Sequence, residues 1–145
     1  MGVTALYTAT TTPPPIRFLA ESLGRAVGDI VWIDNEAAMD TVTAVSGSGP
    51  AYVFLLIETM AQAGVTLGLT KDVALRLARQ TVVGAAQLAA QSPDIAPATL
   101  RENVTSPNGT TAAALSVLME ANKGIDDLFT RAITAARDRS HALSK

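Results

Sequence analysis

The sequence predicts a mainly α-helical protein that begins with a short β-α-β segment. Residues 3–9 and 30–33 are rich in β-branched and aromatic side chains, which is typical of strands. From residue 36 onward, apolar residues recur with helical spacing. Pro50 and Pro97 are placed to start helices, and Gly68 is placed to end one. These observations favour helices over sheet for most of the chain.

The first third of the chain has the order strand, helix, strand. The run TTTPPP at 10–15 cannot lie inside a sheet, and it offers threonines as helix N-caps and Pro14 or Pro15 as a first helical position. The apolar spacing then continues to Gly28. This segment is too short to form an α/β domain by itself.

The rest of the chain is expected to form a series of helices. The segment 36–45 is ambiguous, because 41–45 also has strand propensity. Thr70, and Thr110 or Thr111, are the expected N-caps of two helices. The predicted helices cover 50–67, 71–91, 97–104 and 125–143, and a further one runs from its cap at Thr110 or Thr111 to about Ala121.

Composition excludes several classes of function. Among 145 residues, 48% are hydrophobic, and 11 basic against 13 acidic residues give a net charge of −2. This is neither a disordered composition nor the basic excess of a nucleic-acid binder. With no cysteine and a single histidine, His141, we expect no metal site and no Ser-His-Asp triad. His141 is expected to be solvated.

The apolar run 50–69 is near the length that spans a bilayer, but Glu58 lies in its middle. A helix buried in protein explains the run better, and the first residues of the sequence do not have the pattern expected of a signal peptide. We therefore expect a cytoplasmic protein with no membrane partner. Glu58 is either an acid with a perturbed environment or, as we favour, a core or interface residue paired with an arginine.

The helices 50–67 and 71–91 are apolar around most of their circumference. A surface helix of a small monomer would have a polar half. Exposing such faces costs several kcal/mol per helix at about 25 cal/mol per Å². In a chain this short a second copy is the simplest cover, so the sequence predicts an intertwined dimer.

The run Gly47-Ser48-Gly49-Pro50-Ala51-Tyr52 partly matches a dinucleotide-binding fingerprint. Tyr52 occupies the third small position, and no acidic residue follows on a plausible second strand. A tight helix entry, in which the glycines permit close packing, is the favoured interpretation.

A second run, 105–111, places a glycine-containing turn directly before a helix. Free backbone N–H groups at such a helix start attract anions, and the hydroxyls of Ser106, Thr110 and Thr111 add donors. This chemistry suits a carboxylate or a small phosphate. An ordinary capped helix explains the same pattern, and the pattern alone favours it.

Two long motifs now identify a family. The run 39–52, MDTVTAVSGSGPAY, closely resembles a signature of pyrroline-5-carboxylate reductases, and 104–111, VTSPNGTT, resembles a second signature that usually reads S-P-G-G-T-T. Asn108 stands where that family usually has glycine. The resemblance covers essentially the whole chain.

The resemblance implies an architecture. Residues 1–34 would be a remnant of an N-terminal Rossmann domain that binds NADP or NAD. Residues 35–145 would be an all-helical dimerisation and substrate-binding domain, similar to the C-terminal domain of 6-phosphogluconate dehydrogenase. The expected assembly is a homodimer, with a higher oligomer as an alternative. Because most of the cofactor domain is absent from this chain, we expect the chain alone to be inactive.

The resemblance also implies roles for residues. The family reduces 1-pyrroline-5-carboxylate, a small molecule, to L-proline with NAD(P)H. The substrate carboxylate would take N–H groups of Gly109, Thr110 and Thr111, with Ser106 nearby and Val104 lining the pocket. Thr111 would place its hydroxyl, in a catalytic positioning role, near the ring nitrogen. The other functional hypothesis is a dimerisation module without chemistry.

A third position follows from the first signature. Thr43, just before the Ser-Gly-Ser-Gly run, would lie near the nicotinamide. Little acid–base catalysis is needed, because the cofactor supplies the hydride and a protonated imine is already electrophilic. The chain's own contribution would be positioning, which is consistent with the shortage of histidine.

Overall fold

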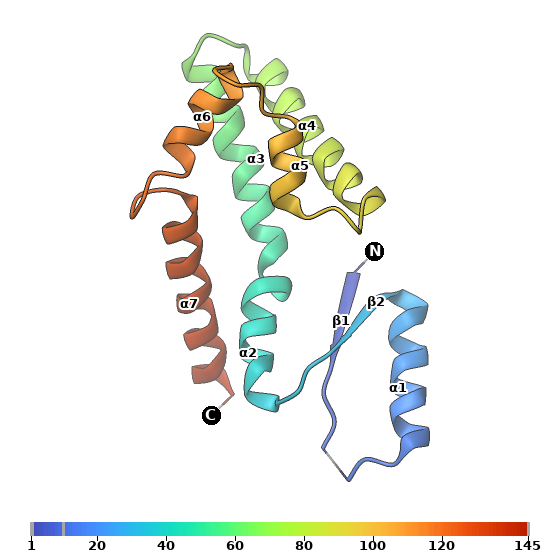
Figure 1. The fold of residues 1–145 in the computed structure, drawn as a ribbon. Helices are drawn as coiled ribbons and strands as arrows, with labels where there is room; N and C mark the ends of the chain where they lie inside the picture. Colours follow the sequence, from blue (N-terminus) through green and yellow to red (C-terminus); the bar gives the residue numbers. More distant parts are fainter. Residues whose placement is uncertain (1, 10, 145) are drawn as a thin grey trace. The chain divides into compact units, whose positions relative to one another are not determined.

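The computed structural model describes residues 2–9 and 11–144, so the outer ends of the two predicted domains lie outside the described residues. The chain forms two compact units. One combines the chain up to Pro50 with the chain from Thr130 onward, and the other is Ala51–Phe129. The expectation of a mainly helical chain with a small β-α-β segment is confirmed (Figure 1). The predicted division between residues 34 and 35 stays a prediction.

The first unit contains a parallel pair of strands, β1 (Gly2–Leu6) and β2 (Gly28–Trp32). The helix α1 (Pro14–Val27) connects them, as parallel strands require. β1 ends earlier than predicted and β2 begins earlier than predicted. The reason is that each strand extends only over the residues that pair with the other strand, from Gly2↔Gly28 to Leu6↔Trp32. Pro13, not a threonine, is the N-cap of α1, and Thr10 lies outside the described residues.

One face of this strand pair is covered by α1. The close approach requires glycine, since a Cβ on Gly24 would lie 2.7 Å from the Ile30 side chain. The Arg17 guanidinium also lies over the Trp32 ring, 4.3 Å from its centroid. A two-stranded parallel sheet leaves both edges unpaired, and such a pair is at best marginally stable alone.

The ambiguous segment after β2 is helical, with three successive geometries. A 3₁₀ turn (Glu36–Ala38) is capped by the Asn35 side chain, which accepts from the Ala38 N–H at 2.9 Å. The helix α2 (Met39–Val42) follows, and a π-helix (Thr43–Gly47) continues it. The strand alternative for 41–45 is therefore wrong.

The second unit is built from helices. The helix α3 (Gly49–Thr66) enters it, and Gly68 ends the turn after α3 with φ of 104°. Thr70 is the N-cap of α4, but its side chain makes no capping hydrogen bond. The other helices of this unit are α4 (Lys71–Gln91), α5 (Pro97–Asn103) and α6 (Thr110–Leu118). The helix α7 (Ile125–Leu143) begins here, but from Thr130 onward it belongs to the first unit.

The described part of the chain buries little apolar surface of its own. Its buried hydrophobic residues are three alanines, Ala44, Ala74 and Ala78. Large apolar side chains on α3, such as Phe54 and Leu55, are 68% and 56% exposed. Each such side chain contributes about 1.5–3 kcal/mol when fully buried. No helix among the described residues is long and apolar enough to cross a bilayer. The helical faces therefore require another cover.

Candidate functional site

The candidate site is the turn that joins α5 to α6. Its first half is held by Thr105, whose N–H donates to the Glu102 carbonyl at 2.9 Å and whose hydroxyl donates to the Arg101 carbonyl at 2.6 Å. Asn108 has φ of 58°, in the left-handed region that asparagine tolerates better than most residues. A Cβ on Gly109 would lie 3.1 Å from the Ser106 carbonyl oxygen, so glycine allows the turn to close tightly.

The turn delivers the chain to α6 with the helix start uncapped. Gly109, not Thr110 or Thr111, is the N-cap, and no side chain caps the helix. The Ala113 N–H donates to the Gly109 carbonyl at 3.1 Å. The N–H groups of Thr110, Thr111 and Ala112 precede that bond and have no carbonyl of the helix to reach. The positive end of the helix dipole adds to their attraction for an anion.

One of the three predicted N–H donors has another role. The Gly109 N–H donates to the Ser106 carbonyl at 3.0 Å and thereby closes the turn. The N–H groups of Thr110 and Thr111 remain as donors for a ligand. The prediction of a side-chain cap by Thr110 or Thr111 is wrong, and the anion interpretation gains from that, because the helix end stays open.

The predicted side chains gather around this helix start. Ser106, Thr110 and Thr111 are exposed, and Val104 is 62% exposed at the C-cap of α5. Within the described ranges, neither the Thr110 nor the Thr111 hydroxyl makes a hydrogen bond to the protein. The second unit therefore presents two N–H donors and three hydroxyls within six residues. Such a group can hold a carboxylate.

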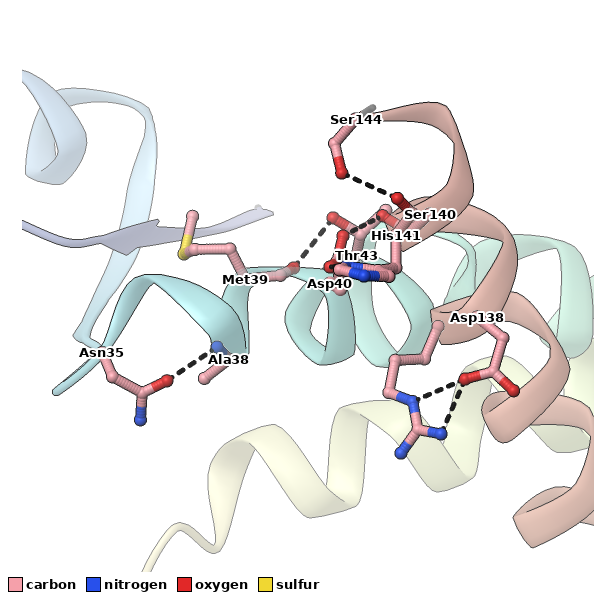
Figure 2. Close-up of polar contacts among 10 residues, drawn as sticks. Asn35, Ala38, Met39, Asp40, Thr43, Asp138, Ser140, His141 and Ser144 are labelled. Carbon is pink, nitrogen blue, oxygen red and sulfur yellow. Dashed lines mark hydrogen bonds and ion pairs between the residues drawn. The ribbon is translucent and has the colours of Figure 1, made fainter.

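Thr43 belongs to the first unit. It opens the π-helix and is exposed, and its hydroxyl donates to the Met39 carbonyl at 3.0 Å (Figure 2). Because the hydroxyl proton is already donated to the Met39 carbonyl, the Thr43 oxygen can act toward a ligand only as a hydrogen-bond acceptor. The Ser48 N–H donates to the Thr43 carbonyl at 2.9 Å, which is the i→i+5 bond of a π-helix. Such turns are frequent at functional sites.

The dinucleotide-fingerprint alternative does not fit this region. Gly47 closes a π-helix and Gly49 opens α3, so no strand leads into the glycines. The close-packing interpretation is also wrong for Gly49 within one chain, because a Cβ there would meet open space. A Cβ on Gly47 would make only ordinary contact with the Thr43 methyl group, at 3.7 Å.

Two other candidate residues have clear surroundings. Glu58 is exposed in a groove of about 730 Å³ between α3 and α4, which also contains Arg79, but the two form no ion pair among the residues that the structure describes. His141 is 62% exposed, as expected, yet its Nδ1 contacts a carboxylate oxygen of Asp40 at 3.2 Å. Sequence reasoning missed this contact, because the two residues are 101 positions apart. Over residues 2–9 and 11–144, no group of acidic residues or histidine could hold a metal ion.

The structure defines a helical domain with exposed apolar faces on α3 and a helix start at α6 that no side chain caps. The sequence model described as "Pyrroline-5-carboxylate reductase dimerisation" matches residues 36–143. The chain belongs to the pyrroline-5-carboxylate reductase family. The resemblance expected from the two motifs is therefore confirmed.

Relatives agree with this assignment. The pyrroline-5-carboxylate reductase of Pseudomonas aeruginosa is 52% identical over 126 residues, which are 87% of this chain and 45% of the relative. That of Pasteurella multocida is 40% identical over 144 residues, 99% of this chain and 52% of the relative. The chain spans about half the length of the curated relatives it matches.

Solved structures share the fold. A pyrroline-5-carboxylate reductase from Coxiella burnetii superposes with a TM-score of 0.88 at 43% identity, over 99% of this chain and 52% of that one. The Plasmodium falciparum pyrroline carboxylate reductase, solved with NADP bound, gives 0.76 at 30% identity, over 97% of this chain and 53% of that one. The expected fold class is thus supported along nearly the whole chain.

Proposed function

We propose that this chain is the substrate-binding and dimerisation part of an enzyme that reduces 1-pyrroline-5-carboxylate to L-proline with NADPH or NADH, in proline biosynthesis. The observation that carries the proposal is the uncapped start of α6 beside the 105–109 turn. It offers N–H donors and hydroxyls to a carboxylate, and the substrate is a small cyclic imine that carries one.

The roles of the residues follow from this arrangement. The N–H groups of Thr110 and Thr111 hold the carboxylate, with Ser106 beside them and Val104 as an apolar wall. The Thr111 hydroxyl, one residue into the helix, is free to approach the ring nitrogen of the substrate. The bound nicotinamide supplies the hydride, so positioning is what the chain contributes.

The chain's own residues fit only one end of the cofactor. The Thr43 oxygen, whose proton is given to Met39, can accept from the carboxamide of a nicotinamide. Among the described residues no glycine-rich turn between a strand and a helix is available to cradle phosphates. We infer that the phosphates bind to a nucleotide-binding domain outside this chain.

The proposed assembly is a homodimer through the helical domain, and the proposed location is the cytoplasm, where metabolism supplies reduced nicotinamide cofactors. The family description and the exposed apolar faces of α3 and α4 support the dimer. The net charge of −2 argues against a nucleic-acid partner, because such binders usually carry a basic excess.

An assay of NADPH oxidation with 1-pyrroline-5-carboxylate tests the proposal. It compares the 145-residue chain with a protein in which this chain is joined to a complete nucleotide-binding domain. We expect turnover only in the joined protein. Equal turnover by the chain alone would contradict the assigned place of the cofactor. No turnover by a folded, dimeric joined protein would favour a dimerisation module without chemistry.

A further inference from the structure

A carboxylate in α2 is held by two consecutive residues of α7. The Ser140 hydroxyl donates to Asp40 Oδ1 at 2.6 Å, and His141 Nδ1 lies 3.2 Å from Asp40 Oδ2 (Figure 2). Both oxygens of the carboxylate are thus engaged from one side. Asp40 is 22% exposed, so this contact lies partly out of water. We name these three residues the Asp40 clasp.

The clasp lies directly before the π-helix. Met39 and Asp40 are the first two residues of α2, which is a single turn of four residues, and the Met39 carbonyl accepts a hydrogen bond from the Thr43 hydroxyl. Asp40 and Thr43 are three positions apart and therefore neighbours on the helix surface. Any rotation of the first turn of α2 moves the carbonyl that orients the Thr43 hydroxyl.

The π-helix needs such a restraint. Its geometry is less favourable than that of an α-helix, and it ends at Gly47, a residue that loses much conformational freedom on ordering. Ala44 is fully buried and fixes one side of the segment. Just before the segment, the Asp40 carboxylate accepts a hydrogen bond from the Ser140 hydroxyl of α7 and lies beside His141 Nδ1.

We propose that Asp40 is a positioning residue, and that its contacts with Ser140 and His141 fix the π-helical turn and through it the Thr43 hydroxyl. The hydrogen bond from the Ser140 hydroxyl to the Asp40 carboxylate, at 2.6 Å, has the short length of charge-assisted bonds, which are among the stronger side-chain contacts in proteins. The inference rests on the proposed placement of Thr43 beside the nicotinamide.

The first arm of the test needs no turnover. Amide hydrogen exchange over residues 43–48 is measured in the full chain and in the joined protein, for the parent, Ser140→Ala, Ser140→Thr and Ser144→Ala. Ser144 is a matched control, because its hydroxyl donates to the His141 carbonyl within the same segment and not to Asp40.

We expect amide exchange over residues 43–48 to be about tenfold faster in Ser140→Ala, as the loss of one such hydrogen bond implies. Ser140→Thr, which keeps a hydroxyl, and Ser144→Ala should match the parent. Unchanged exchange in Ser140→Ala overturns the proposal.

The second arm asks whether the clasp acts through Thr43. In the joined protein, Ser140→Ala should lower kcat several-fold and leave the KM for 1-pyrroline-5-carboxylate unchanged, while Ser140→Thr restores kcat. In a Thr43→Ala background, Ser140→Ala should have no added effect. An additive loss of kcat, or a change in KM alone, contradicts the positioning role. If the joined protein reduces no substrate, the proposed function fails, and the exchange arm still decides whether the clasp restrains the turn.

Discussion

Two backbone positions shape the turn before α6, and they differ in how much side chain they tolerate. Asn108 has a positive φ, whereas Gly109 is in an extended conformation and is limited by the nearby Ser106 carbonyl. The sequence predicted a turn here correctly, because Pro107, Asn108 and Gly109 favour turns through local chemistry. It placed the helix cap on a threonine, because hydroxyl residues generally cap helices. In the structure the Gly109 N–H closes the turn on the Ser106 carbonyl, and Gly109 itself is the N-cap of α6.

Substitution of Asn108 tests the left-handed conformation. Asn108→Gly should change the free energy of unfolding by less than about 1 kcal/mol, since glycine accepts positive φ. Asn108→Val should lower it by roughly 1–2 kcal/mol, because a β-branched side chain is strained there. Thermal unfolding at one fixed protein concentration measures both. Equal stability of the two variants would show that residue 108 is not left-handed in solution.

Thr111 provides the most direct test of the carboxylate site at the residue scale. In the joined protein, Thr111→Ala should raise the KM for 1-pyrroline-5-carboxylate about tenfold, as expected for the loss of one hydrogen bond. Ser116→Ala is the matched control, because Ser116 lies farther along α6 and donates to the Ala113 carbonyl. Unchanged KM and kcat in Thr111→Ala would refute its assigned role.

At the scale of elements, local signals and tertiary packing determine different boundaries. Pro14 and Pro97 mark the starts of α1 and α5 as predicted, since proline acts through its own ring geometry. Gly28 and Asp29 are poor strand formers, so the sequence predicted a later start for β2. In the structure β2 begins at Gly28, because both residues pair with β1. The π-helix at Thr43–Gly47 has no local signature. Nor does any sequence rule join Asp40 to α7.

We expect a second copy of the chain to cover the groove between α3 and α4. It is lined mainly by apolar side chains such as Leu75, with Glu58 and Arg79 among them. Leu75→Asp should raise the dissociation constant of the dimer by about 100-fold or more, since burying an unpaired carboxylate costs several kcal/mol. Sedimentation velocity over a concentration series measures it.

A control separates dissociation from unfolding. Leu75 is 37% exposed in the single chain, so at a protein concentration at which Leu75→Asp is still dimeric, the variant should keep the helical content of the parent seen by circular dichroism. Leu143→Asp places the same charge on an exposed leucine at the end of α7 and should leave the dimer intact. If both variants dissociate equally, or if neither does, the groove is not the interface.

At the scale of the whole molecule, the chain has helices without a sufficient core. Apolar periodicity predicted the helices, and the excess of apolar faces predicted that something must cover them. The described residues bury alanines and leave leucine, valine and phenylalanine side chains in water. A monomer with such faces would lack most of the hydrophobic free energy that offsets the entropy of folding. Association and folding are therefore expected to be linked.

Light scattering coupled to size-exclusion chromatography most directly tests whether the chain associates, because it measures the mass of the folded species in solution. The chain has a mass of 15.0 kDa, so a dimer has a mass of 2 × 15.0 = 30 kDa. We predict a mass of 30 kDa, or a multiple of it, for the helical protein. When dilution separates the subunits, the helical signal in circular dichroism should be lost. A stable, fully helical species of 15.0 kDa at all concentrations would contradict it.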